Sequence, residues 1–150
     1  MINVLYIDDE PHNLTSFHAS FRREFNVFTA ESAEEGRKIL EQKPIHVILS
    51  DQRMPKTTGI EFFESILESF PEPIRILITG YTDINAVIDS INRGQVYKYL
   101  TKPWNEDDIK NFIIKAYEVY KLRKENEELT NKLMDLNKKL EFLARQNLLS

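Results

Sequence analysis

The sequence predicts an α/β fold in which five parallel strands form one doubly wound sheet, followed by a long helix. Short apolar runs rich in β-branched residues alternate with helical patterns, which is typical of βα units. Five such repeats occupy about 100 residues, whereas an eight-stranded barrel needs about 250. All four glycines and all six prolines lie within the first 103 of the 150 residues, so residues 104–150 contain no helix breaker. We therefore expect the strand order 2-1-3-4-5 and an extended last helix.

Each expected strand is a short run of mostly apolar residues. Such runs favour parallel strands that are covered by helices on both faces. The five runs are Val4–Ile7, Val27–Thr29, Ile45–Leu49, Ile74–Thr79 and Val96–Leu100.

Four helices are expected between the strands. Three of them are indicated by apolar residues at helical spacing. These positions are Leu14, Phe17 and Phe21; Ile60, Phe63 and Leu67; and Ile84, Val87, Ile88 and Ile91. Ser32 and Glu35 predict a capping box at the start of the second helix. Asp83 is expected to cap the fourth helix, and Gly94 to end it in a left-handed conformation.

The composition excludes several classes of protein. The chain has 20 basic and 24 acidic residues, a net charge of −4, and no cysteine. It therefore has no disulfide frame and no thiolate metal ligands. A slightly acidic chain is not expected to bind nucleic acid directly, and no apolar run approaches the ~20 residues that a bilayer requires. We expect a cytoplasmic protein that does not contact a membrane.

Polar residues follow the expected strands at the edge where doubly wound sheets bind ligands. They are Asp8-Asp9-Glu10, Ser50-Asp51, Thr79-Gly80 and Thr101-Lys102-Pro103. Converging carboxylates repel one another unless a cation is present, and a donor set made only of oxygen atoms favours Mg²⁺. Lys102 could balance a carboxylate at rest and a phosphoryl oxygen in an acylphosphate, while the Thr79 hydroxyl donates to another oxygen. This arrangement indicates nucleophilic chemistry on a carboxylate.

An ordered set of motifs lies at the ends of the expected strands. They are Ile7-Asp8-Asp9-Glu10, Ser50-Asp51-Gln52-Arg53-Met54-Pro55 with Gly59, Thr79-Gly80, and Tyr99-Leu100-Thr101-Lys102-Pro103. In these motifs, residues 1–120 resemble the receiver domains of two-component response regulators, which have a flavodoxin-like fold.

The resemblance implies a role for each matching position. Asp51 corresponds to the phosphoacceptor, which takes its phosphoryl group from a sensor histidine kinase or a phosphotransfer protein. Asp8 and Asp9 correspond to the acidic pair that supports Mg²⁺, and Arg53 to the residue whose backbone carbonyl is a metal ligand. The remaining implied roles are phosphate contact for Lys102 and Thr79, a rotamer switch for Tyr99, and a cis bond between Lys102 and Pro103. The side chains of Gln52 and Arg53 are expected beside the acceptor, where such residues tune phosphate loss.

Each of these residues also has an ordinary structural interpretation. The Asp8-Asp9 pair could form a turn, Thr79 could bond to the backbone, Lys102 could be a surface charge, and Tyr99 could be a fixed strand residue. A phosphate-independent dimerisation module is the main functional alternative. A hydrolase of the aspartyl-phosphate type would need an acid where the chain has Arg53. We therefore expect no enzyme beyond one that catalyses its own phosphorylation and dephosphorylation.

The chain is expected to continue from the receiver, residues 1–120, into a coiled coil, residues 121–150. An Asn105 cap followed by acidic residues 106–108 starts the helix, whose first turns pack on the sheet through Ile109, Phe112, Ile113 and Ala116. The positions that follow form a heptad seam. Its a and d residues are Val119, Leu122, Asn126, Leu129, Leu133, Leu136, Leu140, Leu143 and Asn147.

The seam predicts a partner helix. Asn126 at an a position favours a parallel homodimer, in which Glu118 and Arg123 could attract each other across the two chains. Leucine at both a and d leaves other oligomers open, and an antiparallel hairpin lacks any turn residues. The apolar residues Leu148 and Leu149 are compatible with a stand-alone dimer or with a signalling helix that leads to a C-terminal output domain.

Overall fold

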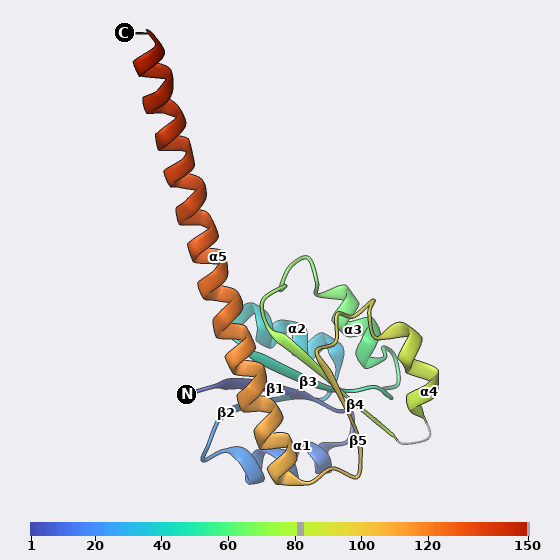
Figure 1. Cartoon of the computed structure of the whole chain (residues 1–150). Coiled ribbons are helices and arrows are strands. Elements are labelled where there is room, and N and C mark those ends of the chain that lie inside the picture. Colours follow the sequence, from blue (N-terminus) through green and yellow to red (C-terminus); the bar gives the residue numbers. More distant parts are fainter. Residues whose placement is uncertain (81–82, 150) are drawn as a thin grey trace.

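A computed structural model describes residues 1–80 and 83–149 of the chain. Strands and helices alternate along the sequence, and the last helix extends far beyond the sheet (Figure 1). The elements are β1 (Asn3–Ile7), α1 (Pro11–Phe21), β2 (Asn26–Ala30), α2 (Ala33–Gln42), β3 (Val47–Asp51), α3 (Gly59–Ser65), β4 (Ile74–Gly80), α4 (Ile84–Val87), the 3₁₀ turn η2 (Ile88–Ser90), β5 (Lys98–Lys102) and α5 (Glu106–Leu149).

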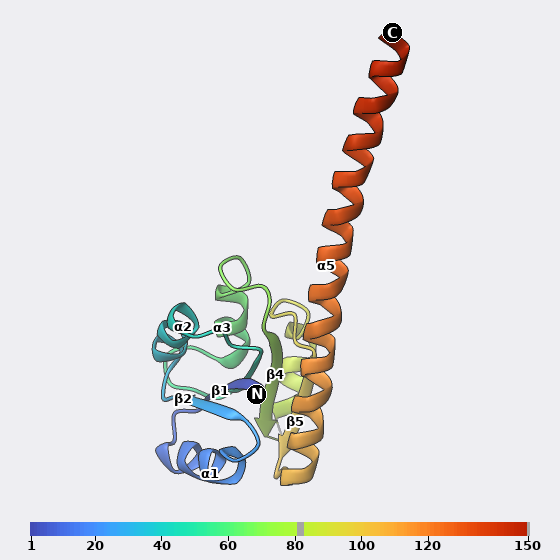
Figure 2. The same cartoon turned by 90° about the vertical axis from the view of Figure 1, so that its left-hand side faces the viewer.

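The five strands form one parallel sheet in the order β2-β1-β3-β4-β5, which confirms the predicted topology. The sheet separates two hydrophobic cores, because the side chains of a strand alternate between its two faces. Val4 and Tyr6 of β1 pack against α1 and α5, while Leu5 and Ile7 pack against α2 and α3. Figure 2 shows α1 and α5 on one side of the sheet and α2 and α3 on the other. These layers leave the carboxyl ends of the strands accessible at one edge.

Two strands are displaced from their predicted positions. β3 covers Val47–Asp51 instead of Ile45–Leu49, and β5 covers Lys98–Lys102 instead of Val96–Leu100. Ile45 is buried but lies outside the strand. The apolar run therefore predicted the burial correctly and the strand bounds two residues too early. As a consequence, Asp51 and Lys102 are themselves the last residues of their strands.

The prediction for the fourth helix is wrong in three respects. α4 has only four residues before it tightens into η2, and the Asp83 side chain makes no cap hydrogen bond. Gly94 has no positive φ; Gln95 adopts that conformation instead, with φ of 49°. Gly94 is needed for close packing, because a Cβ there would lie 3.2 Å from the Cβ of Phe63.

The helix caps agree only in part with the prediction. Ser32 accepts a hydrogen bond from the Glu35 amide, but the Glu35 carboxylate accepts from the amide of Glu31, so that box is half formed. A complete box, not predicted, joins Thr58 and Glu61 at the start of α3. The predicted cap of α5 is confirmed, since the Asn105 side chain accepts from the Asp108 amide at 2.8 Å.

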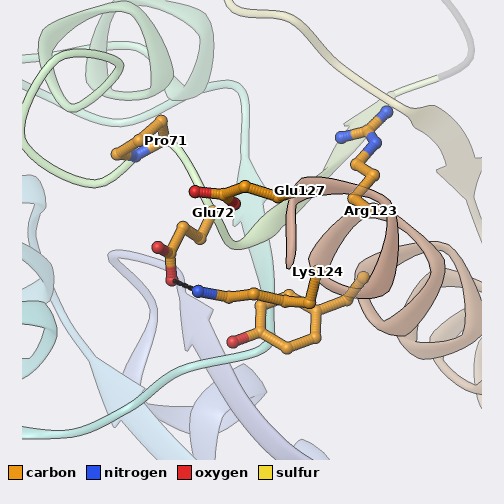
Figure 3. Close-up of a pocket in the computed structure, with 6 residues that line it drawn as sticks. Pro71, Glu72, Arg123, Lys124 and Glu127 are labelled. Carbon is orange, nitrogen blue, oxygen red and sulfur yellow. Dashed lines mark ion pairs between the residues drawn. The ribbon is translucent and has the colours of Figure 1, made fainter. Parts of the chain in front are cut away.

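α5 contains 44 residues, and its two halves have different surroundings. Ile109, Ile113 and Ala116 are completely buried against the sheet. Further along the helix, Lys124 still contacts the domain, because its Nζ lies 2.7 Å from the Glu72 carboxylate in the loop before β4 (Figure 3). The six seam leucines that follow Val119 remain 54–65% exposed. In the described part of the chain, no helix combines the length and apolarity needed to cross a membrane.

Candidate functional site

Three predicted carboxylates meet at the carboxyl edge of the sheet. Asp8 follows β1, and Asp51 ends the neighbouring β3. Asp8, Asp9 and Asp51 each offer one carboxylate oxygen, and these oxygens lie within 4.8 Å of one another. Asp8 and Asp51 are buried, which excludes most of the water that would otherwise screen their repulsion. The cluster is therefore a set of oxygen donors of the kind that binds hard divalent cations.

Lys102 supplies the positive charge of the site. It ends β5 and pairs with Gly80 across the ladder, so its side chain passes the end of β4 to reach Asp51 on β3. The distance from Lys102 Nζ to Asp51 Oδ1 is 3.0 Å, and the lysine side chain remains 35% exposed. The ion pair thus joins strands that are not neighbours in the sheet.

Burial raises the pKa of the Asp51 carboxyl. Lys102 opposes this effect through its hydrogen bond and its charge, whereas the charges of Asp8 and Asp9 add to it. The ionised carboxylate is therefore held in a site that disfavours its charge. A bound cation would relieve this penalty.

Asp8 is held in place by three donors. The Tyr6 hydroxyl and the Asn13 amide donate to its Oδ2 at 2.8 and 3.0 Å, and the Glu10 backbone amide donates to Oδ1 at 3.0 Å. Burial and the Asp8 charge raise the pKa of Tyr6, so its hydroxyl stays protonated and continues to donate. The sequence interpretation missed Tyr6 and Asn13. Tyr6 could have been predicted, because it precedes Asp8 by two residues and residues at this spacing point to the same face of a strand.

The two predicted switch residues differ in their exposure to solvent. Thr79 is completely buried, and its hydroxyl is 3.5 Å from the Gly80 carbonyl, which is a long contact for a hydrogen bond. Tyr99 in β5 is 43% exposed. Their roles in phosphate contact and switching remain predictions. The expected cis bond between Lys102 and Pro103 is present.

The loop after β3 orients its two polar side chains differently. Gln52 Oε1 accepts from the Ile60 amide at 3.0 Å, so Gln52 caps α3. Arg53 instead extends to Asp83, with 2.6 Å between its Nη2 and Asp83 Oδ1. Gly59 lets α3 approach β3, because a Cβ there would lie 2.7 Å from the Asp51 carbonyl oxygen. Asp83 was predicted only as a helix cap, and its pairing with Arg53 depends on loop geometry.

An open depression of about 450 Å³ lies at this edge of the sheet. Its lining consists of Asp9, Glu10, Asp51, Arg53, Met54, Pro55, Gly80, Asp83 and Lys102. The Asp51 carboxylate therefore lines an open space that is bordered by cationic side chains. Of the described residues, Arg53 and Lys102 are the two basic ones in this lining.

The family model for the response regulator receiver domain matches residues 4–114. The chain belongs to this family. The matched region contains every residue of the depression and, apart from Asn3 at the start of β1, all five strands.

Two transcriptional regulators that are similar to this chain are much longer than it. The hydrogenase transcriptional regulatory protein HoxA from Cupriavidus necator is 40% identical over 120 residues, which cover 80% of this chain and 25% of that protein. HoxA from Bradyrhizobium diazoefficiens is 35% identical over 124 residues, which cover 83% and 26%. The chain thus spans about a quarter of the length of these relatives.

A solved structure supports the same assignment. The response regulator receiver domain protein from Clostridium thermocellum is 30% identical and superimposes with a TM-score of 0.75. The comparison covers 81% of this chain and 98% of that one. The receiver fold therefore accounts for the whole sheet and its covering helices.

Proposed function

We propose that this receiver domain accepts a phosphoryl group on Asp51 from the phosphohistidine of a sensor histidine kinase or a phosphotransfer protein. The observation that carries the proposal is the position of Asp51, which ends β3 beside two other carboxylates and 3.0 Å from the Lys102 ammonium. A carboxylate oxygen forms the new P–O bond as the P–N bond breaks, and the electron pair remains on the imidazole nitrogen. Cytoplasmic action is part of the same proposal.

The site fits Mg²⁺ because its donor set consists of clustered carboxylate oxygens. Asp8, Asp9 and Asp51 would hold the ion, together with the backbone carbonyl of Arg53. When bound, Mg²⁺ would neutralise these carboxylates and the charge that develops on the transferring phosphoryl group.

The chain's own residues would perform the remaining steps. Lys102 would exchange its contact with the Asp51 carboxylate for one with a phosphoryl oxygen, since its side chain is partly exposed and can adjust. The Thr79 hydroxyl would donate to another phosphoryl oxygen, and Tyr99 would move from its exposed position. The domain would catalyse only its own phosphorylation and dephosphorylation.

The long helix supports a second part of the proposal, a parallel homodimer formed through the seam. Three residues of α5 attach it to the domain: Tyr117 and Tyr120 pack on His46, and Lys124 pairs with Glu72. They occupy b and f positions of the heptad, on the side opposite the a and d residues. The domain therefore leaves the seam accessible from Leu122 onward, where that leucine is 65% exposed.

A second copy of this chain is the occupant that fits the seam best. The apolar repeat is matched to itself, and Asn126 can pair its amide with the same residue of the other chain. We propose that the phosphorylation state passes through α5 and this coil to an output partner. The names of the relatives make transcriptional regulation the class of output to test first.

Phosphoryl uptake tests the proposed chemistry. The protein is incubated with a small-molecule phosphodonor, with Mg²⁺ or with a chelator, and its intact mass is followed over time. One phosphoryl adduct is expected only with Mg²⁺, and Lys102→Ala is expected to form it more slowly. The matched control, Lys110→Ala, removes a lysine whose partner is Glu24, away from the site, and is expected to behave as wild type. Equal uptake with the chelator would contradict the metal role.

A further inference from the structure

Arg53 and Asp83 form an ion pair at the border of the proposed phosphorylation site. The distance from Arg53 Nη2 to Asp83 Oδ1 is 2.6 Å. The Arg53 side chain is 81% exposed, whereas that of Asp83 is 24% exposed. The pair joins the loop after β3 to the start of α4, and both residues line the same depression as Asp51. The guanidinium is therefore held near the acceptor by one carboxylate while most of it stays accessible.

A phosphoryl group on Asp51 would introduce a second anion close to this guanidinium. The depression contains four carboxylates, from Asp9, Glu10, Asp51 and Asp83, and only two cations. A phosphoryl group adds a charge of about −1.5 to −2, and the planar guanidinium binds phosphate oxygens through paired hydrogen bonds. Arg53 lies two residues from Asp51 along the chain and lines the same depression, so the flexible Arg53 side chain could reach the new anion.

We propose that Asp83 competes with the phosphoryl group for Arg53. Arg53 pairs with Asp83 while Asp51 is unmodified, and it pairs with the phosphoryl group once Asp51 is modified. Asp83 is thus a positioning residue that acts through Arg53. This inference rests on the proposed function of Asp51.

The exchange would also release the side chain at the start of α4. Asp83 makes no side-chain cap hydrogen bond while it binds Arg53, and its own backbone is helical, with φ of −94° and ψ of −9°. The pair with Arg53 is therefore the contact that this carboxylate would lose, without a direct contact between Asp51 and α4.

A double-mutant cycle tests the competition. The phosphoryl mimic is beryllium fluoride, added with Mg²⁺ to the full chain. The fraction of protein that binds it is measured by ¹⁹F NMR over a range of mimic concentrations. Asp83→Asn is expected to tighten binding about two- to five-fold, the range of an exposed ion pair. Arg53→Gln is expected to weaken binding, and in the Arg53→Gln background Asp83→Asn is expected to have no larger effect than Glu10→Gln. Melting temperatures verify that each variant folds.

Glu10→Gln is the matched control for general electrostatics, because it removes a carboxylate from the same depression that is not paired with Arg53. Its effect is expected to persist in the Arg53→Gln background. Unchanged binding by Asp83→Asn would overturn the competition, and so would a gain that keeps its full size in the Arg53→Gln background. If wild type and Asp51→Asn both fail to bind the mimic, the proposed function of Asp51 fails instead, which is a separate result.

Discussion

A single charge placed in the seam of α5 is expected to dissociate the proposed dimer. Leu133 occupies an a position and is 61% exposed in the single chain. Complete burial of a leucine contributes about 1.5–3 kcal/mol, so covering the exposed three-fifths contributes about 1–2 kcal/mol per chain. Two chains lose about 2–4 kcal/mol when Leu133 becomes Asp, which corresponds to a roughly 30- to 700-fold weaker dimer. Two carboxylates that face each other weaken it further.

Sedimentation equilibrium over a range of protein concentrations measures this change. Met134→Asp is the matched control, because Met134 is the next residue, is 58% exposed and occupies a b position outside the seam. It is expected to leave the dimer almost unchanged. A wild-type chain that stays monomeric at all concentrations would refute the dimer. Equal weakening by both variants would show that the seam is assigned to the wrong face.

Three further changes address the stability of the domain. Gly59→Ala is expected to cost about 1–3 kcal/mol in urea denaturation, because the new Cβ would lie 2.7 Å from the Asp51 carbonyl oxygen. His46→Gln is expected to flatten the pH dependence of stability below pH ~6.5. Burial and the N-terminal ammonium lower the pKa of His46 in the folded state, so His46 is protonated at higher pH in the unfolded chain, and acid favours unfolding. Asp51→Asn is expected to raise the melting temperature at pH 7 without Mg²⁺, because burial raises the Asp51 pKa and the ionised form is unfavourable in the folded state.

Each of these expectations has its own control or contrary result. Gly80→Ala is the control for Gly59→Ala, since a Cβ at Gly80 meets its nearest neighbour at an ordinary 3.4 Å. An acid slope that is unchanged in His46→Gln would show that other groups cause it. The gain from Asp51→Asn must disappear as the pH falls below 3.8, where the wild-type carboxyl is protonated in both states. A gain that persists there would have another cause than the charge.

The topology and the meeting of Asp8, Asp51 and Lys102 could be predicted from the sequence for a simple reason. In a doubly wound sheet the carboxyl ends of the central strands converge whatever the exact strand bounds are. A displacement of β3 and β5 by two residues therefore did not separate the predicted residues. The length of α5 could also be predicted, because residues 104–150 contain no helix breaker.

Features that depend on loops or on tertiary packing were not predictable in the same way. The apolar spacing predicted a regular fourth helix, but α4 tightens into a 3₁₀ turn after Val87. Gly94 was predicted to end this helix, whereas in the structure it allows close packing against Phe63. The pairing of Arg53 with Asp83 joins two loops that are 30 residues apart. Local propensity contains no information about such a contact.

The most direct test of the account is to locate the phosphoryl group on the chain. The protein is incubated with Mg²⁺ and a phosphodonor and then reduced with borohydride, which converts an aspartyl phosphate into homoserine. Tandem mass spectrometry is expected to find homoserine at position 51 alone, and Asp51→Asn is expected to yield none. Homoserine at another position, or an unchanged Asp51 after donor treatment with Mg²⁺, would contradict the assignment of Asp51 as the phosphoacceptor.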